Sequence, residues 1–255
     1  MRRSGATRCR ASFMAAAPAL AVIASVPFLG GANAQEPAVE SDAYAISRGG
    51  QLYDKWWEAL GAKGPTSTHP SYPATAKQKG EGTWRCKECH GWDYLGAAGA
   101  YSKGGRFTGI KGIRGKVGAD VKQVETILRD KTHAYTPQML PDKAIERLAR
   151  FVSAGQVDVG PHIDSATKKA KGDLARGAGL YQTVCAVCHG FDGKILNFGT
   201  KEQPEYVGTI AQENPWEMLH KIRNGQPNAA MPAWAGLSVK DQVDVLTYTQ
   251  TLPAK

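Results

Sequence analysis

One five-residue frame occurs twice in this chain of 255 residues, as Cys86-Lys87-Glu88-Cys89-His90 and again as Cys185-Ala186-Val187-Cys188-His189. In both copies two cysteines stand three positions apart and a histidine follows the second one directly. In a helix, residues at that spacing lie about one turn apart on the same face. Both thiols and the neighbouring histidine are therefore expected to face one site in each copy.

The pattern C-x-x-C-H is the attachment site of a covalently bound c-type haem. The spacing lets both thiols reach the two vinyl groups of one porphyrin, and the adjacent histidine projects over the ring toward the iron. We therefore predict two haem c groups, each with its iron. The predicted attachment residues are Cys86, Cys89, Cys185 and Cys188, and the predicted iron ligands on the same segments are His90 and His189.

Three other interpretations of the cysteines compete with haem attachment. A disulfide pair suits an oxidising compartment, but it does not require a histidine next to both copies. A thioredoxin-like redox motif is expected within a βαβ pattern, and no such pattern surrounds either copy. A zinc site needs four ligands, whereas these two pairs lie 99 residues apart. Haem attachment accounts for both histidines and is therefore preferred.

An internal repeat extends beyond the two frames. Each frame is followed by glycine, an aromatic residue and aspartate, later by an aromatic-x-glycine triplet, and finally by a methionine just before an amphipathic stretch. The paired segments are Gly91-Trp92-Asp93 with Gly190-Phe191-Asp192, Phe107-Thr108-Gly109 with Tyr206-Val207-Gly208, and Met139 with Met231. Each half of the chain is thus predicted to be one haem domain.

With these segments the chain resembles a bacterial dihaem cytochrome c made of two class I cytochrome c domains in tandem. In the second half the likeness also includes Gly179-Leu180-Tyr181, Asn228-Ala229-Ala230-Met231-Pro232 and Leu237-Ser238. The resemblance implies an all-α fold in which each haem occupies a cleft, with histidine on one face of the iron and methionine on the other. It places Met231 as the distal ligand of the second haem.

The first half departs from that pattern. Its frame follows Gly50-Gln51-Leu52-Tyr53 after a loop insert, roughly Trp56 to Trp84, that the second half lacks. We predict Met139 as the sixth ligand of the first iron, because Met139 and Met231 both stand immediately before a final amphipathic helix. His133, six residues earlier, is the alternative ligand.

The chain begins with a predicted signal peptide, residues 1–34. A basic start precedes an apolar, alanine-rich stretch that closes with Ala32-Asn33-Ala34, and small residues at that end suit cleavage after Ala34. An uncleaved membrane anchor is the alternative, but Pro18 and Pro27 favour cleavage. No later apolar run approaches spanning length, so we predict a periplasmic protein without stable membrane insertion. Residues 35–160 and 161–255 are then the two predicted cytochrome c domains.

The charge balance bears on the partner. The chain carries 32 basic and 23 acidic residues, and four of the bases stand in the predicted signal peptide. The remaining excess is too modest to indicate nucleic acid. A basic, glycine-rich loop from Tyr94 to Ala119 favours either a redox protein partner with an acidic docking face or hydrogen bonds to haem propionates; a solvated loop is the alternative. Its bases are Lys103, Arg106, Lys111, Arg114 and Lys116.

Two haems with both axial positions filled leave no open site for a substrate, so we predict an electron carrier rather than an enzyme. Histidine and methionine ligation raises the reduction potential and suits cycling between Fe(II) and Fe(III). A dihaem oxidoreductase acting on a small inorganic donor at the first haem is the alternative, since the first half offers two candidates for the sixth ligand. A gas or redox sensor is a third possibility and also needs an exchangeable ligand.

Overall fold

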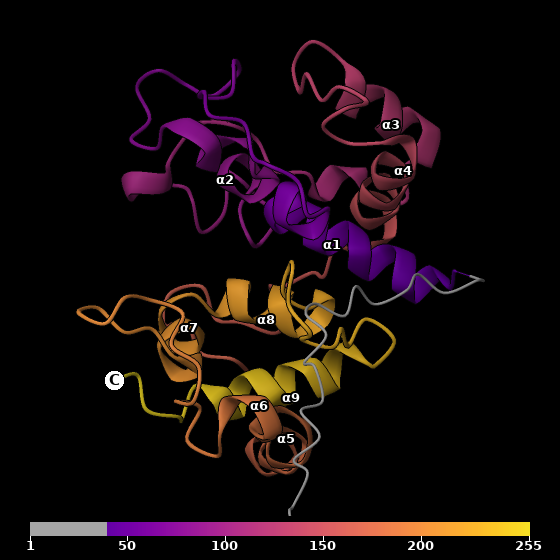
Figure 1. The fold of residues 1–255 in the computed structure, drawn as a ribbon. Coiled ribbons are helices and arrows are strands. Elements are labelled where there is room, and N and C mark those ends of the chain that lie inside the picture. The colour runs from indigo at the N-terminus through magenta and orange to yellow at the C-terminus, as the bar shows by residue number, and fades with distance from the viewer. Residues whose placement is uncertain (1–39) are drawn as a thin grey trace, which may run out of the picture. The chain divides into compact units, whose positions relative to one another are not determined.

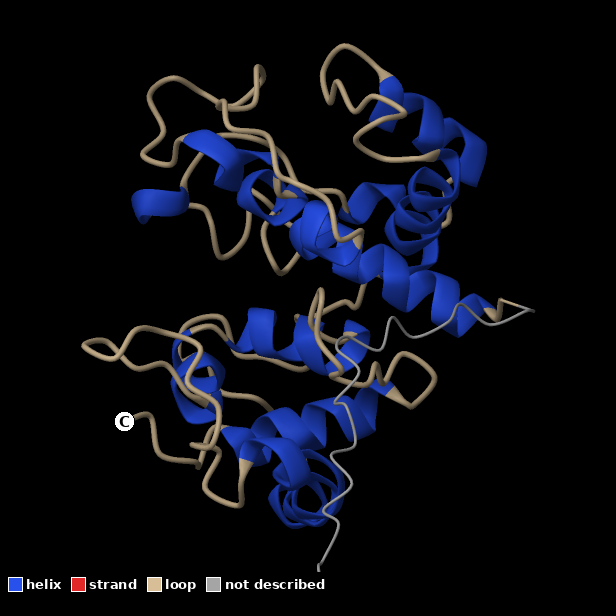
Figure 2. Cartoon of the chain, in the orientation of Figure 1, coloured by secondary structure: helices blue, strands red, loops and turns tan. Residues whose placement is uncertain are grey.

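The computed structural model describes residues 40–255 (Figure 1). All regular elements in this range are helical (Figure 2), and the only β contacts there are two isolated bridges. The predicted all-α fold is therefore confirmed. The predicted signal peptide, residues 1–34, and its cleavage point lie outside the described residues. Within residues 40–255, no helix combines the length and the apolar character needed to cross a membrane.

The first half, residues 40–160, contains four α-helices joined by short helical turns. No helix or strand lies between the end of the first helix at Ala59 and the turn that begins at Gly80. Trp56 and Trp57 belong to that first helix, so the segment without regular structure is shorter than the predicted insert. The elements are α1 (Asp42–Ala59), η1 (Gly80–Trp84), α2 (Cys86–His90), η2 (Gly104–Arg106), η3 (Arg114–Lys116), α3 (Val121–Arg129), α4 (Asp142–Arg150) and the π-helical turn η4 (Phe151–Gly155).

The second half, residues 161–255, follows a similar order. The amphipathic stretches predicted after Met139 and Met231 correspond to α4 with its extension η4 and to α9. The elements are α5 (Leu174–Leu180), the π-helical turn η5 (Tyr181–Cys185), α6 (Ala186–His189), α7 (Val207–Glu213), α8 (Pro215–Asn224) and α9 (Val239–Thr249).

Side-chain caps fix where several helices begin. In each case the residue before the helix accepts a hydrogen bond from the backbone N–H three positions later, which satisfies one of the free donors of the first turn. The capping residues are Ser41 before α1, Asp120 before α3, Asp173 before α5 and Ser238 before α9.

The first and last helices of each half pack together at a glycine. Helix α1 packs on α4, and α5 packs on α9. A Cβ added at Gly49 would collide with the carbonyl oxygen of Arg147, and one added at Gly177 would collide with that of Asp244. Only glycine lets the two backbones approach this closely. The crossing occurs four residues before a tyrosine in both halves, at Tyr53 and Tyr181.

Those two tyrosines make the same hydrogen bond. The hydroxyl of Tyr53 donates to the carbonyl oxygen of Gly91 at 2.6 Å, and the hydroxyl of Tyr181 donates to that of Gly190 at 3.0 Å. Both glycines directly follow a C-x-x-C-H frame and end its helix with positive φ, 78° and 81°. Glycine adopts this conformation without strain. The sequence repeat is thus matched by a repeated set of contacts around each frame.

Replacing Gly177 with alanine is expected to lower the free energy of unfolding by about 1–3 kcal/mol, because the new methyl group overpacks the α5–α9 crossing. Gly179 in the same helix is a matched control, since a Cβ there meets no atom within 4 Å. Gly179→Ala is expected to be neutral or stabilising by up to about 1 kcal/mol. Denaturant titrations followed by circular dichroism measure both; equal effects would contradict the close-crossing argument.

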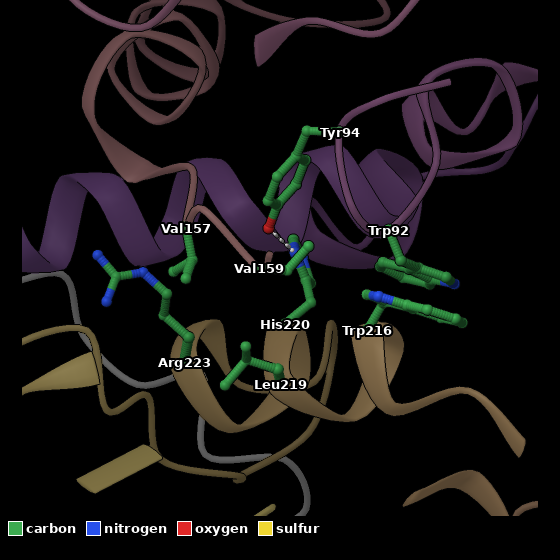
Figure 3. Close-up of a pocket in the computed structure, with 8 residues that line it drawn as sticks. All are labelled: Trp92, Tyr94, Val157, Val159, Trp216, Leu219, His220 and Arg223. Carbon is green, nitrogen blue, oxygen red and sulfur yellow. Dashed lines mark hydrogen bonds between the residues drawn. The ribbon is translucent and has the colours of Figure 1, made fainter. Parts of the chain in front are cut away.

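The two halves contact each other through buried side chains. Trp92 and Tyr101 of the first half pack in the hydrophobic cluster of the second half. Figure 3 shows the Tyr94 hydroxyl pointing at His220 of α8, and it lies 2.8 Å from the Nδ1 atom. The Nε2 atom of His220 donates to the carbonyl oxygen of Gly50 in α1 at 2.9 Å. Burial lowers the pKa of His220 to about 4, so this histidine stays neutral.

Candidate functional site

The first C-x-x-C-H frame forms the short helix α2 and presents Cys86, Cys89 and His90. Both cysteines are free thiols. Burial raises the pKa of Cys86 to about 11 and that of Cys89 to about 12, so both thiols stay protonated at neutral pH. The Sγ atom of Cys86 lies 3.8 Å from the hydroxyl of Tyr135, which itself donates to the carbonyl oxygen of Trp84.

His90 has one ring nitrogen committed and one available. Its Nδ1 atom lies 2.8 Å from the carbonyl oxygen of Lys111, so Nδ1 carries the proton and donates it. Nε2 then holds a lone pair. Burial lowers the pKa of His90 to about 4, which keeps the ring neutral. A neutral histidine whose second N–H is held by a carbonyl is the usual form of a metal-ligating imidazole.

The second frame lies at the end of η5 and in α6. Cys185 and Cys188 are free, and His189 is half-buried. Burial lowers the pKa of His189, and among the described residues no hydrogen-bond partner reaches its buried Nδ1 atom. The two cysteine pairs do not come together: within residues 40–255, no group of three or more histidine, cysteine, aspartate or glutamate side chains is placed to hold a metal ion.

Large apolar side chains around the second frame are open to solvent. Their exposed fractions are 79% for Val187, 72% for Phe191 and 67% for Ile195, and Leu196 and Phe198 are exposed as well. Solvent-facing apolar groups gathered in one segment mark a surface that something else covers. The ring of Phe198 lies 5.9 Å from that of His189, so this apolar surface adjoins the histidine of the frame.

The residues present fit a covalently bound haem at both frames. Each frame supplies two free thiols and a histidine within five residues. The first histidine has an available Nε2, and the second lies against an uncovered apolar surface. A porphyrin is a large apolar ring that would cover such a surface.

The two candidate methionines stand in different surroundings. Met231 is half-buried in the loop between α8 and α9, and that loop returns to α8 through a hydrogen bond from Trp234 to the carbonyl oxygen of Ile222. Met139 is half-buried in the turn before α4. It lines a cavity of about 320 Å³ together with Trp56, Trp84 and residues 62–65.

His133, the alternative ligand in the first half, lies close to His90. The ring centroids of the two histidines are 6.3 Å apart and their planes are tilted by 34°. The structure therefore brings His90 together with His133 across 43 positions of sequence. The sequence offered His133 only as the alternative ligand, because its approach to His90 depends on how the loop after α3 folds back.

Charged side chains near the first frame form a buried network that sequence reasoning missed. Asp54 of α1 is 1% exposed at its side chain, and it pairs with Arg85 and with Lys221 of α8. Burial opposes the charge of Asp54, but the attraction of Lys221 and Arg85 outweighs it and lowers the pKa to about 2. A lone aspartate in a helix gives no sequence signal for such a role.

The basic loop is partly neutralised within the molecule. Arg106 pairs with the buried carboxylate of Glu88 at 3.0 Å, and Arg114 lies 3.8 Å from Asp158. Lys103, Lys111 and Lys116 are exposed. The loop therefore presents fewer unneutralised charges than its sequence suggests.

Comparison with known proteins finds similarity to cytochromes. Residues 172–248 match the family described as cytochrome C oxidase, cbb3-type, subunit III. The chain is 25% identical over 107 residues to the protein named cytochrome c6 from Thermostichus vulcanus, an alignment covering 42% of this chain and 94% of that protein. It is 32% identical over 84 residues to the protein named cytochrome c-553-like from Synechocystis sp., covering 32% of this chain and 71% of that protein.

Proposed function

The chain belongs to the cytochrome c family, and from this we propose that it is an exported dihaem cytochrome that carries electrons between redox partners. The observation that carries the proposal is the repetition of one complete attachment frame, with two free thiols and a histidine in each half. When bound, haem supplies one-electron cycling of its iron between Fe(II) and Fe(III).

The roles of the residues follow from their chemistry. Cys86 and Cys89 attach the first haem through thioethers, and His90 donates its Nε2 lone pair to the iron while the Lys111 carbonyl orients its ring. In the second half, Cys185 and Cys188 attach the haem and His189 binds its iron. Met231 supplies the distal thioether there. For the first iron, Met139 stays a prediction beside its alternative, His133.

We also propose how the chain is organised and delivered. Residues 35–160 and 161–255 each form one haem domain, and the tyrosine–glycine hydrogen bond and glycine crossing repeated in the two halves support that division. The first 34 residues direct export to the periplasm and are removed after Ala34. The exposed Lys103, Lys111 and Lys116 contribute to docking of a redox protein with an acidic face.

Intact mass spectrometry of the exported protein tests this proposal directly. We expect a chain that begins at Gln35 and carries the added mass of two haems, because both frames keep all their attachment residues. A Cys185→Ala/Cys188→Ala variant is expected to retain one haem, at the first frame. A wild-type mass lacking both haems, or thiol labelling at all four cysteines, would refute the proposed function.

A further inference from the structure

We propose that His133, rather than Met139, is the second axial ligand of the iron held at the first frame, and that the 60–79 segment holds it in place. The inference rests on the proposed function, because it requires haem on Cys86 and Cys89. It departs from the sequence prediction of Met139 and makes the two haem sites chemically different.

The separation of the two histidine rings is the first observation. Two imidazoles bonded to one metal ion from opposite sides, each at about 2 Å, place their centroids roughly 6 Å apart. The His90 and His133 centroids are 6.3 Å apart. The observed separation agrees with that of two imidazoles that bind one iron from opposite sides.

The hydrogen bonds of the two rings match as well. The Nδ1 atom of His133 lies 2.9 Å from the carbonyl oxygen of Ile127, just as Nδ1 of His90 lies 2.8 Å from that of Lys111. Each Nδ1 therefore carries its proton and donates it, and each Nε2 keeps a lone pair. Among the described residues, no hydrogen bond engages either Nε2. Two oriented imidazoles with available Nε2 atoms form the donor set of a bis-histidine iron.

Met139 lies in different surroundings. The cavity that it lines is formed with Trp56, Trp84, Gln138 and residues 62–65, and within the described part of the chain that lining includes neither cysteine of the first frame nor His90. Met139 also packs against the hydrophobic cluster of the first half. A flexible thioether that fills an irregular gap in a core is a common use of methionine.

The 60–79 segment explains how His133 is held. His69 accepts a hydrogen bond from the N–H of Ser71 at Nδ1, so its Nε2 carries the proton and donates to the carbonyl oxygen of His133 at 2.9 Å. The hydroxyl of Ser71 donates to the carbonyl oxygen of Thr132 at 2.6 Å. The 60–79 segment, which the second half lacks, thus binds the neighbouring carbonyl oxygens of Thr132 and His133. His69 is a positioning residue in this arrangement.

The backbone next to His133 adopts an unusual conformation, as expected at a ligand site. Ala134 has a φ of 57°, in the left-handed region that residues with a Cβ rarely adopt. Its N–H donates to the carbonyl oxygen of Asp130 at 2.8 Å, which closes the turn that carries His133. Strain of this kind persists where surrounding contacts enforce it, and it gathers at ligand sites.

Low-temperature electron paramagnetic resonance of the oxidised holoprotein tests the proposal, with haem content counted on the same samples. We expect Met139→Ala to keep both low-spin haem signals. We expect His133→Ala to lose one of the two, about half of the low-spin intensity, and to bind carbon monoxide at that haem when reduced. Added imidazole should restore the lost signal, and the intact signal of the second haem shows that the variant is folded.

His69 provides a separate measurement. His69→Ala is expected to weaken the low-spin signal of the first haem partly, because His133 loses one of its restraints, whereas His69→Gln keeps a side-chain donor and should restore most of it. His162, at the start of the second half, gives a control: His162→Ala should leave both signals unchanged.

The outcomes separate the ligand assignment from the proposed function. Two haems per chain with the first low-spin signal lost only in Met139→Ala would overturn His133 while leaving the electron carrier intact. If His133→Ala carries two haems and keeps the low-spin signal of the first haem, the assignment of His133 is likewise overturned and the electron carrier stands. A protein without covalent haem would overturn both proposals.

Discussion

The Met231→Ala variant is expected to lose the thioether–iron charge-transfer band of the second haem. We also expect its reduction potential to fall by on the order of 0.1 V or more, since axial ligation sets potentials over roughly 0.8 V. The thioether of methionine favours Fe(II), and without it water or no ligand occupies the sixth position. The reduced second haem should then bind carbon monoxide. Potentiometric titration with optical spectra measures all three effects.

Another methionine of the second half provides the control. Met218 is buried in α8 within the hydrophobic cluster, so Met218→Leu removes a thioether from the core and is expected to cost less than about 1.5 kcal/mol of stability. Its charge-transfer band and potential should match the wild type. If the band survives in Met231→Ala, Met231 is not the distal ligand and the second half departs from the cytochrome c pattern.

Unequal ligation would give the two haems a direction of electron flow. Methionine as the second ligand raises the potential of a haem relative to histidine. A bis-histidine first haem would therefore lie below a His/Met second haem, and electrons entering at the first would pass downhill to the second. The buried contacts between the halves, including Tyr94 with His220, keep the two sites at a fixed separation. Such an arrangement suits a short relay better than a store of two equivalent electrons.

The sequence predicted those features that depend on local spacing. The two attachment frames, their short helices and the helical character of the final segments all follow from residues within a few positions of one another. These patterns can be recognised because a helical turn has a fixed repeat, and haem attachment requires a fixed spacing of its two cysteines and histidine.

The features that the sequence did not predict depend on contacts between distant segments. His90 meets the Lys111 carbonyl only after the loop before α3 has folded. His69 reaches the His133 carbonyl across 64 positions, and Tyr94 reaches His220 across 126. Every residue has a backbone carbonyl, so residue type does not show which carbonyl accepts a hydrogen bond from a histidine. The segment that orients an imidazole therefore cannot be recognised from the sequence of one chain.

Replacing Asp54 with alanine is expected to lower the free energy of unfolding by about 3–5 kcal/mol, because it leaves the cations of Arg85 and Lys221 without their shared buried partner. The Nζ atom of Lys221 lies 2.6 Å from Oδ2 of Asp54, and Arg85 bonds both the Oδ1 atom and the backbone carbonyl. Arg85 precedes the first frame and Lys221 belongs to α8, so the loss should weaken contact between the halves. Urea titration followed by circular dichroism measures it.

The same carboxylate gives the protein an acid-dependent stability. Its folded pKa, about 2, lies below the unfolded value, so the stabilisation is complete above the unfolded pKa and disappears as the pH falls through the folded one. Between pH about 4 and 2 the wild type should lose stability more steeply than Asp54→Ala.

Glu58→Ala is the control, because the Glu58 carboxylate and its partner Lys55 are both partly exposed. It should lower the free energy of unfolding by less than about 1 kcal/mol. Equal costs for Asp54→Ala and Glu58→Ala, with parallel acid profiles, would show that the buried network does not join the halves.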